Sequence, residues 1–167
     1  MQLAGATTGQ WWRLNGPGGV NFVGQSRIVE TVDSYAGGGR FLVVAVHPLP
    51  AFPTALYVRA AQVSRMNSQW FLPAVVQLRS GRAGPFPGAL ASAERNARAF
   101  ILDDLSRHPD LVMIDTDSAR HTVSRPDFDF LAFYNEDPRF RAAWAPYREV
   151  QPLYGYRLFV REGAQRK

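Results

Sequence analysis

The sequence predicts a three-layer, Rossmann-like α/β fold with a mostly parallel sheet and a C-terminal antiparallel hairpin. Two uninterrupted apolar runs, Phe41–Val46 and Leu111–Asp115, are typical of strands that helices cover on both faces. Between them, Gly88–Arg107 carries apolar residues at helical spacing, with Glu94 and Arg98 as an i, i+4 pair on its polar side. This alternation of strand and helix, joined by right-handed crossovers, favours a doubly wound sheet.

The remaining elements are predicted from local patterns. A proline interrupts one of the expected strands, and prolines open two of the expected helices. In chain order we expect a helix over Ser26–Tyr35, a helix over Thr54–Met66, a strand over Gln69–Leu78, a helix from near Pro126 capped within Ser124–Asp127, a helix from Asp137 through Trp144, and a hairpin of Tyr147–Leu153 and Tyr156–Arg161 around Tyr154-Gly155.

The chain divides into three parts. Residues 1–24 are rich in Gly, Thr and Asn and are predicted to form an arm or linker. Residues 25–162 form the α/β domain, and residues 163–167 a polar tail. A length of 167 residues suffices for one domain with a core of its own. Within the arm, Trp11 and Trp12 are expected either to pack back onto the domain or to lie at a membrane interface.

Composition narrows the classes of function. The absence of cysteine excludes disulfides, thiolate catalysis and cysteine-bound metals. The net charge of +5 comes almost wholly from arginine, with Lys167 the only lysine. These arginines are scattered singly, so no nucleic-acid partner is expected. No segment reaches the length of about 18 apolar residues that a membrane helix needs, and no export signal is visible at the start.

Candidate ligand-binding residues follow the two central strands. His47 comes after the first, and a polar group comes with the second: Asp115, Asp117, Arg120 and His121. Ligands in open α/β sheets bind beyond the carboxyl ends of strands, so these side chains are candidates for acid–base chemistry or ligand contact. The structural alternative is that Asp115 and Asp117 cap the turn through backbone N–H groups.

Sharper catalytic motifs are missing. No glycine-rich loop follows the first strand, which argues against nucleotide and methyl-donor cofactors, and no Gly-x-Ser-x-Gly elbow is present. His47, His108 and His121 lack the spacing of a zinc site, and His108 is best explained as a helix-end residue. We therefore predict no catalytic residue, metal or cofactor within the chain.

Aromatic residues are dense near the C-terminus, and most are expected to be core. On the helix predicted from Pro126, the core side comprises Phe128, Leu131, Ala132 and Tyr134. Phe130 lies outside that side of the predicted helix and is therefore the candidate for an exposed contact.

A longer string of residues carries a family resemblance. It consists of Val43–Val46, Ala51–Pro53, Arg65, Trp70, Leu72-Pro73, Pro109–Val112, Ile114-Asp115, Phe128–Leu131, Asp137–Phe140, Trp144 and Tyr147. Over about Phe41–Arg161 the chain resembles the soluble C-terminal region of bacterial integral-membrane glycosyltransferases that use polyprenyl-phosphate sugars. These enzymes are related to protein mannosyltransferases and aminoarabinose transferases.

The resemblance implies a membrane-embedded body that carries the catalytic acidic residues and lies outside this chain. The chain would then be an accessory domain on the extracytoplasmic (periplasmic) face of the inner membrane, contacting that body and an acceptor glycan or lipid-linked sugar. Trp11 and Trp12 would lie close to the bilayer. Two alternatives remain open. One is a stand-alone, cytoplasmic α/β hydrolase or transferase that uses the His47/Asp115 crevice; the other is a basic surface for anionic glycan or nucleic acid.

Overall fold

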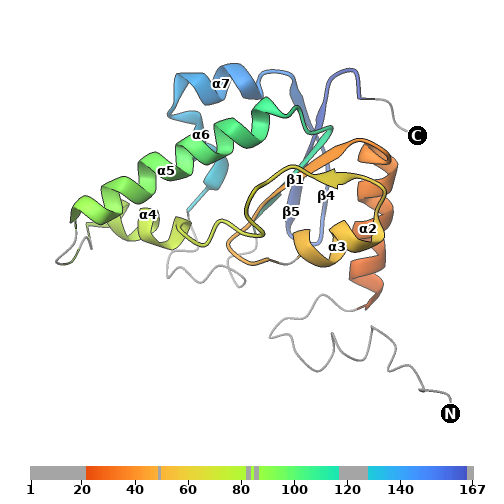
Figure 1. Ribbon diagram of the computed structural model, residues 1–167, viewed down its shortest axis with the longest axis horizontal. Helices are drawn as coiled ribbons and strands as arrows, with labels where there is room; N and C mark the ends of the chain where they lie inside the picture. Colours follow the sequence, from red (N-terminus) through yellow and green to blue (C-terminus); the bar gives the residue numbers. More distant parts are fainter. Residues whose placement is uncertain (1–21, 49, 82–83, 85–86, 117–127, 165–167) are drawn as a thin grey trace, which may run out of the picture.

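The computed structural model describes residues 22–48, 50–81, 84, 87–116 and 128–164 (Figure 1). Its elements, in chain order, are α2 (Phe22–Ala36), β1 (Arg40–Val44), α3 (Ala51–Tyr57), β2 (Ala61–Gln62), α4 (Leu72–Arg79), α5 (Pro87–Ser106), β3 (Leu111–Asp115), α6 (Phe130–Asn135), α7 (Pro138–Trp144), β4 (Tyr147–Leu153) and β5 (Tyr156–Arg161).

A five-stranded mixed sheet, in the order β2-β1-β3-β5-β4, forms the centre of the fold. β1 pairs in parallel with β2 and β3, whereas β5 pairs antiparallel with β3 and β4. The α/β class and the C-terminal hairpin are confirmed. The prediction of a mostly parallel sheet is wrong, because a two-residue turn joins only antiparallel strands and the hairpin adds β5 directly beside β3.

One predicted strand is a helix. The segment Gln69–Leu78 contains α4, with Pro73 in its first turn, where a missing N–H is not needed. The same proline in a central strand would interrupt the hydrogen-bond ladder. The helix predicted over Thr54–Met66 is also wrong, because α3 ends at Tyr57 and the chain then forms β2. The edge strand on the parallel side of the sheet, β2, is consequently only two residues long.

The other helices follow the sequence more closely. α5 and α7 match their predicted ranges, and α2 begins earlier than predicted, at Phe22. α6 begins at Phe130, later than the predicted start near Pro126. Its cap is Asp129, whose carboxylate accepts the N–H groups of Leu131 and Ala132 at 2.8 and 3.1 Å. The cap predicted within Ser124–Asp127 lies outside the described residues.

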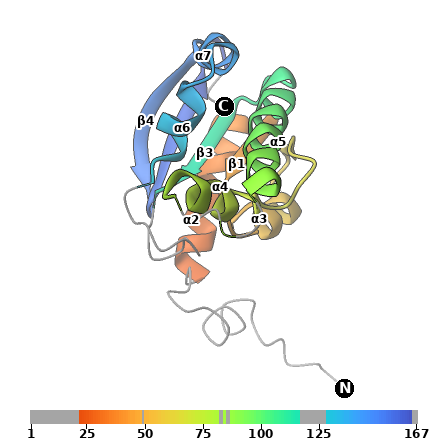
Figure 2. The same ribbon diagram turned by 90° about the vertical axis from the view of Figure 1, so that its left-hand side faces the viewer.

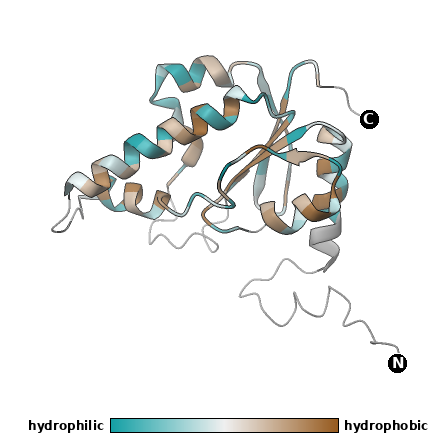
Figure 3. Ribbon diagram, in the orientation of Figure 1, coloured by the Kyte–Doolittle hydropathy of each residue, from teal (hydrophilic) through white to brown (hydrophobic). Residues whose placement is uncertain are grey.

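Helices cover both faces of the sheet (Figures 1 and 2). α2 and α3 share one core cluster with the sheet, and α4, α5, α6 and α7 share the other. Side chains of β1 alternate between the two, with Leu42 and Val44 in the second cluster and Phe41 and Val43 in the first. Figure 3 accordingly shows the central strands coloured as hydrophobic.

Most of the C-terminal aromatic residues belong to the core, as predicted, and four of them also form a stack. Tyr134, Phe140, Trp144 and Tyr147 follow one another with ring centroids 5.0 to 5.4 Å apart. The prediction that Phe130 is exposed is wrong. Its side chain is buried in the same core, because α6 starts at Phe130 and directs its first residue toward the sheet.

Candidate functional site

His47 and Asp115 lie at the same end of the sheet, where the parallel strands β1 and β3 have their carboxyl ends. β1 and β3 are parallel neighbours, with Val44 opposite Ile114, so the residues that follow both strands leave the sheet together. The chain passes from β1 to β2 on one side and returns to β3 on the other, which makes this edge the switch point of the parallel strands. Asp115 is buried and His47 is half-buried.

The remaining members of that predicted site are not placed. Asp117, Arg120 and His121 lie outside the described residues, as do Trp11 and Trp12. Thr116, directly after β3, donates from its backbone N–H and from its hydroxyl to the carbonyl oxygen of Gly155, each at 2.8 Å. The exit of β3 is therefore tied to the turn of the β4–β5 hairpin.

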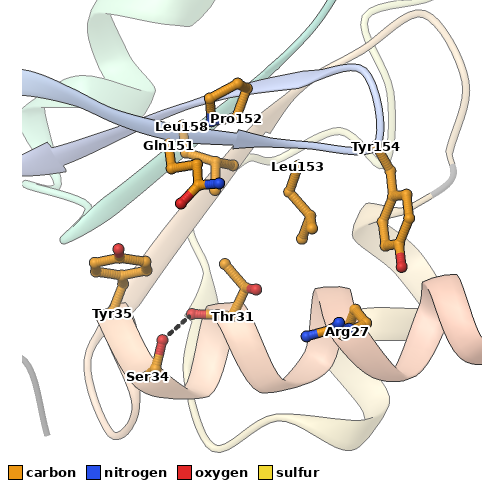
Figure 4. A pocket seen from close by; sticks show the side chains of 9 residues that line it. All are labelled: Arg27, Thr31, Ser34, Tyr35, Gln151, Pro152, Leu153, Tyr154 and Leu158. Carbon is orange, nitrogen blue, oxygen red and sulfur yellow. Dashed lines mark hydrogen bonds between the residues drawn. The ribbon is translucent and has the colours of Figure 1, made fainter.

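A groove of about 470 Å³ lies between α2 and that hairpin (Figure 4). Tyr35 and Tyr154 stand at its two ends, and Leu153 projects between them toward α2. We call it the polar groove, and its lining comprises Arg27, Thr31, Ser34, Tyr35, Gln151, Pro152, Leu153, Tyr154 and Leu158.

One wall of the polar groove is a stripe along α2. Ile28 and Val32 are fully buried against the sheet, so Arg27, Thr31 and Tyr35, spaced by one helical turn each, lie beside that buried face. The hydroxyl of Ser34 donates to the carbonyl oxygen of Thr31 at 2.9 Å. The helical repeat thus aligns hydroxyl groups and one guanidinium along the groove.

The opposite wall is the hairpin, where the ladder is irregular. The register between β4 and β5 shifts between Val150 and Leu153, and Pro152, which has no N–H to pair, lies within the shift. The turn residues Tyr154 and Gly155 have φ of 47° and 77°, the conformation of a type I′ hairpin turn. Together with the hydrogen bonds from Thr116, this geometry holds the end of the groove in place.

The side chains that line the polar groove are suited to binding a ligand. It offers hydroxyl, amide and guanidinium donors, two tyrosine rings and an apolar patch of proline and leucine. No carboxylate or histidine is found among the residues described as lining it, so those residues supply no acid–base pair or nucleophile. Such a surface suits a polyhydroxylated ligand, whose hydroxyls pair with polar side chains while a ring face lies on an aromatic.

Most other charged residues in the described part of the chain pair with one another. Arg79 and Arg98 each contact both Glu94 and Glu136, which joins α4, α5 and the end of α6. Hydrogen bonds from Arg79 hold the pKa of Glu94 and of Glu136 below the usual range. The pair predicted between Glu94 and Arg98 is confirmed, and it belongs to this larger network. Further pairs are Arg65–Asp103, Arg107–Asp103, Arg139–Asp137, Arg157–Glu149 and Arg161–Asp110.

Asp104 is a buried carboxyl that sequence analysis missed. Burial raises its pKa to about 6, although a hydrogen bond with Ser64 acts in the opposite direction. The residue joins the segment after β2 to α5, far along the chain from the polar groove. The available signal was its place beside Leu105 on the apolar side of α5, where a carboxylate is unexpected.

Sequence analysis also missed the polar groove. The sequence places Tyr35 at the end of a predicted helix and Tyr154 in a predicted hairpin turn. More than a hundred residues separate the two walls, and no local pattern joins them. The groove arises because β5 adds beside β3 and thereby brings the hairpin across the face that α2 covers.

The described residues show neither a metal-binding cluster nor a membrane-spanning helix. Within the described ranges, no three His, Asp or Glu side chains gather closely enough to hold a metal ion. No helix in those ranges is both long and apolar enough to cross a bilayer.

Comparison of the chain with protein-family models, curated proteins and solved structures finds no match.

Proposed function

We propose that this chain is a non-catalytic accessory domain of a membrane glycosyltransferase that uses polyprenyl-phosphate sugars, and that its polar groove binds acceptor glycan. The groove carries the proposal, because its described lining combines hydrogen-bonding groups and tyrosine rings with no acid–base pair. In this proposal the domain lies on the extracytoplasmic face, and the membrane-embedded part of the same protein performs the chemistry.

The residues behind the family resemblance have structural roles. Asp129 and Asp137 cap α6 and α7, and Trp144 and Tyr147 belong to the aromatic stack. Residues that specify caps and stacking recur when a fold recurs, so their presence supports a shared Rossmann-like, three-layer architecture more directly than a shared reaction. Glycan binding therefore needs its own test.

Titration of the 167-residue chain with soluble disaccharides, followed by NMR shifts of backbone amides, tests the proposal. Chitobiose, mannobiose and a uronic acid disaccharide cover neutral, acetylated and acidic ligands. We expect the shifts to centre on Thr31 and Leu153. Thr31→Val removes one hydroxyl without changing shape, and Gln151→Ala removes one amide; each should weaken binding by about fivefold to tenfold.

Gln77→Ala is the matched control, because Gln77 is exposed on α4, away from the groove. The proposal fails if none of the sugars binds, or if the groove variants and the control bind equally well.

A second candidate is a small hydrolase or transferase that uses the strand-end corner. It is favoured by one observation: β1 and β3 are parallel neighbours, which brings His47 and Asp115 to the switch point of the parallel strands. Activity in a substrate screen that disappears in both His47→Ala and Asp115→Ala would support this candidate. Activity that both variants retain would remove it.

A further inference from the structure

Two arginines differ from the others in the described part of the chain. Each of the other arginines placed by the structure contacts a carboxylate, carbonyl or hydroxyl oxygen of the protein. Arg27 and Arg148 are exposed and have no such partner among the described residues. A guanidinium that the fold does not neutralise is available to a ligand, because its planar fork matches the oxygens of a carboxylate or a phosphate.

Arg27 belongs to the polar groove. It lies on α2, and Figure 4 shows it at the end of the groove where Tyr154 stands. None of the residues described as lining the groove is acidic, so an anion bound beside Arg27 would meet no carboxylate there. Glu30, the nearest acidic residue along α2, is exposed and lies outside that lining. The groove therefore presents positive charge to a ligand.

Arg148 projects to the same face of the sheet. It lies on β4 opposite Val160 of β5, and residues directly opposite in an antiparallel pair share a face. Val160 is buried in the core cluster that α2 shares with the sheet. β4 runs from Arg148 toward the turn at Tyr154, so Arg148 lies beyond the other end of the groove, where Tyr35 stands.

The two unpaired arginines therefore bracket the groove. The helical rise from Arg27 to Tyr35 is about 12 Å, and the groove volume of about 470 Å³ is within the range of cavities that hold ligands larger than a single ring. Positive charge toward both ends, with no described carboxylate in the lining between them, suits an oligosaccharide that carries acidic groups. A neutral glycan would leave both guanidiniums without a partner.

We propose that the glycan bound by the polar groove is acidic, with a carboxylate or phosphate substituent that accepts hydrogen bonds from the guanidinium of Arg27. This inference rests on the proposed function, because it names the class of glycan that the same groove takes. Arg148 attracts a further acidic group along the oligosaccharide. The tyrosine rings and the hydroxyl groups of α2 contact the sugar rings, whatever charge the glycan carries.

Isothermal titration calorimetry of the 167-residue chain with digalacturonate and with its methyl ester tests the proposal, because these two disaccharides differ mainly in charge. We expect the acid to bind about tenfold more tightly than the ester at low salt. This advantage should shrink as salt rises, since the two arginines are exposed. Glucose phosphate and glucose form a second matched pair, which shows whether the groove prefers phosphate or carboxylate.

Variants assign the preference to individual side chains. Arg27→Gln should lower the affinity for the acid by about fivefold and leave that for the ester nearly unchanged, because the amide keeps hydrogen-bonding groups without the charge. Arg27→Lys should retain part of the preference, since it keeps the charge without the planar fork. Arg148→Gln should weaken acid binding by about twofold, because Arg148 lies outside the groove lining.

Arg95→Gln is the matched control, because Arg95 is an exposed arginine on α5, which covers the opposite face of the sheet. The proposal is overturned if the neutral member of both pairs binds as tightly as the acid while Thr31→Val still weakens binding; the groove would then take glycan without regard to charge. Equal losses of acid binding in Arg27→Gln and Arg95→Gln also overturn it, since net charge alone would explain the preference. If no acid and no neutral sugar binds, the proposed function falls as well.

Discussion

The two helical layers of this domain use their aromatic and charged residues differently. In the layer of α6 and α7, aromatic rings stack on one another, and Arg79, Arg98, Glu94 and Glu136 form a closed network. In the layer of α2 and α3, aromatic and charged residues line the polar groove or are exposed at the surface. The aromatic and charged side chains of the first layer already pair with one another. We therefore expect contacts with ligand, partner or membrane on the layer of α2 and α3.

Replacing one phenylalanine in each layer gives the largest expected contrast. Phe140 is 1% exposed and stacks between Tyr134 and Trp144, so Phe140→Ala should lower the free energy of unfolding by about 3–5 kcal/mol. Phe52→Ala should change it far less, by about 0.5 kcal/mol, because more than half of that residue's surface is already exposed to water. Chemical denaturation of both variants measures the two losses.

If the Phe140→Ala protein does not fold, Phe140→Leu should still show a loss well above that of Phe52→Ala. Equal losses at the two positions would mean that the exposed α3 ring packs on something within the chain, and the contrast between the layers would be wrong.

Asp104 is a buried carboxyl in the layer whose other charged side chains pair with one another, and its titration tests how far that layer shields it from water. Its folded-state pKa of about 6 lies above the ordinary aspartate value of 3.8, because burial disfavours the charged carboxylate. The folded state then binds the proton more tightly than the unfolded state. This contribution to stability is present at low pH and is lost as the pH rises from about 4 through about 6.

The measurement compares unfolding of the parent chain and Asp104→Asn across that window. Relative to the variant, the parent should lose roughly 2 kcal/mol of stability as the pH rises. The variant removes only this titration, so other carboxylates cancel in the difference. Parallel stability curves would show that Asp104 titrates at an ordinary pKa and that water reaches it freely.

Elements encoded by local signals were predictable from sequence. Three local patterns predict an element with bounds correct to within a few residues. They are the apolar periodicity of α5, the Asp-Pro start of α7 and the two-residue turn of the hairpin. The segment around Pro73 was not predictable in this way. An apolar run with a proline suits either an interrupted strand or a helix with proline in its first turn, and only tertiary packing against α5 decides.

The candidate sites were predictable to different degrees. His47 follows β1 and Asp115 is the last residue of β3, and the parallel pairing of these two strands brings both residues to the same end of the sheet, so sequence order alone sufficed. The polar groove depends on where the hairpin docks. Nothing between Tyr147 and Arg161 states which strand β5 will join, and the hairpin would close the same way beside either edge.

Two arginines complete the comparison of the layers. The guanidinium of Arg98 lies 4.3 Å from the ring centroid of Phe133 and contacts Glu94 and Glu136, and its side chain is mostly buried. Arg98→Ala should therefore cost about 1–2 kcal/mol, from lost packing as well as lost charge pairing. Arg27→Ala, on the polar groove, should cost less than about 0.5 kcal/mol while weakening any ligand bound there. A stability loss at Arg27 as large as that at Arg98 would show that the groove is held together by its own lining, and such a groove would be structural instead of open to ligand.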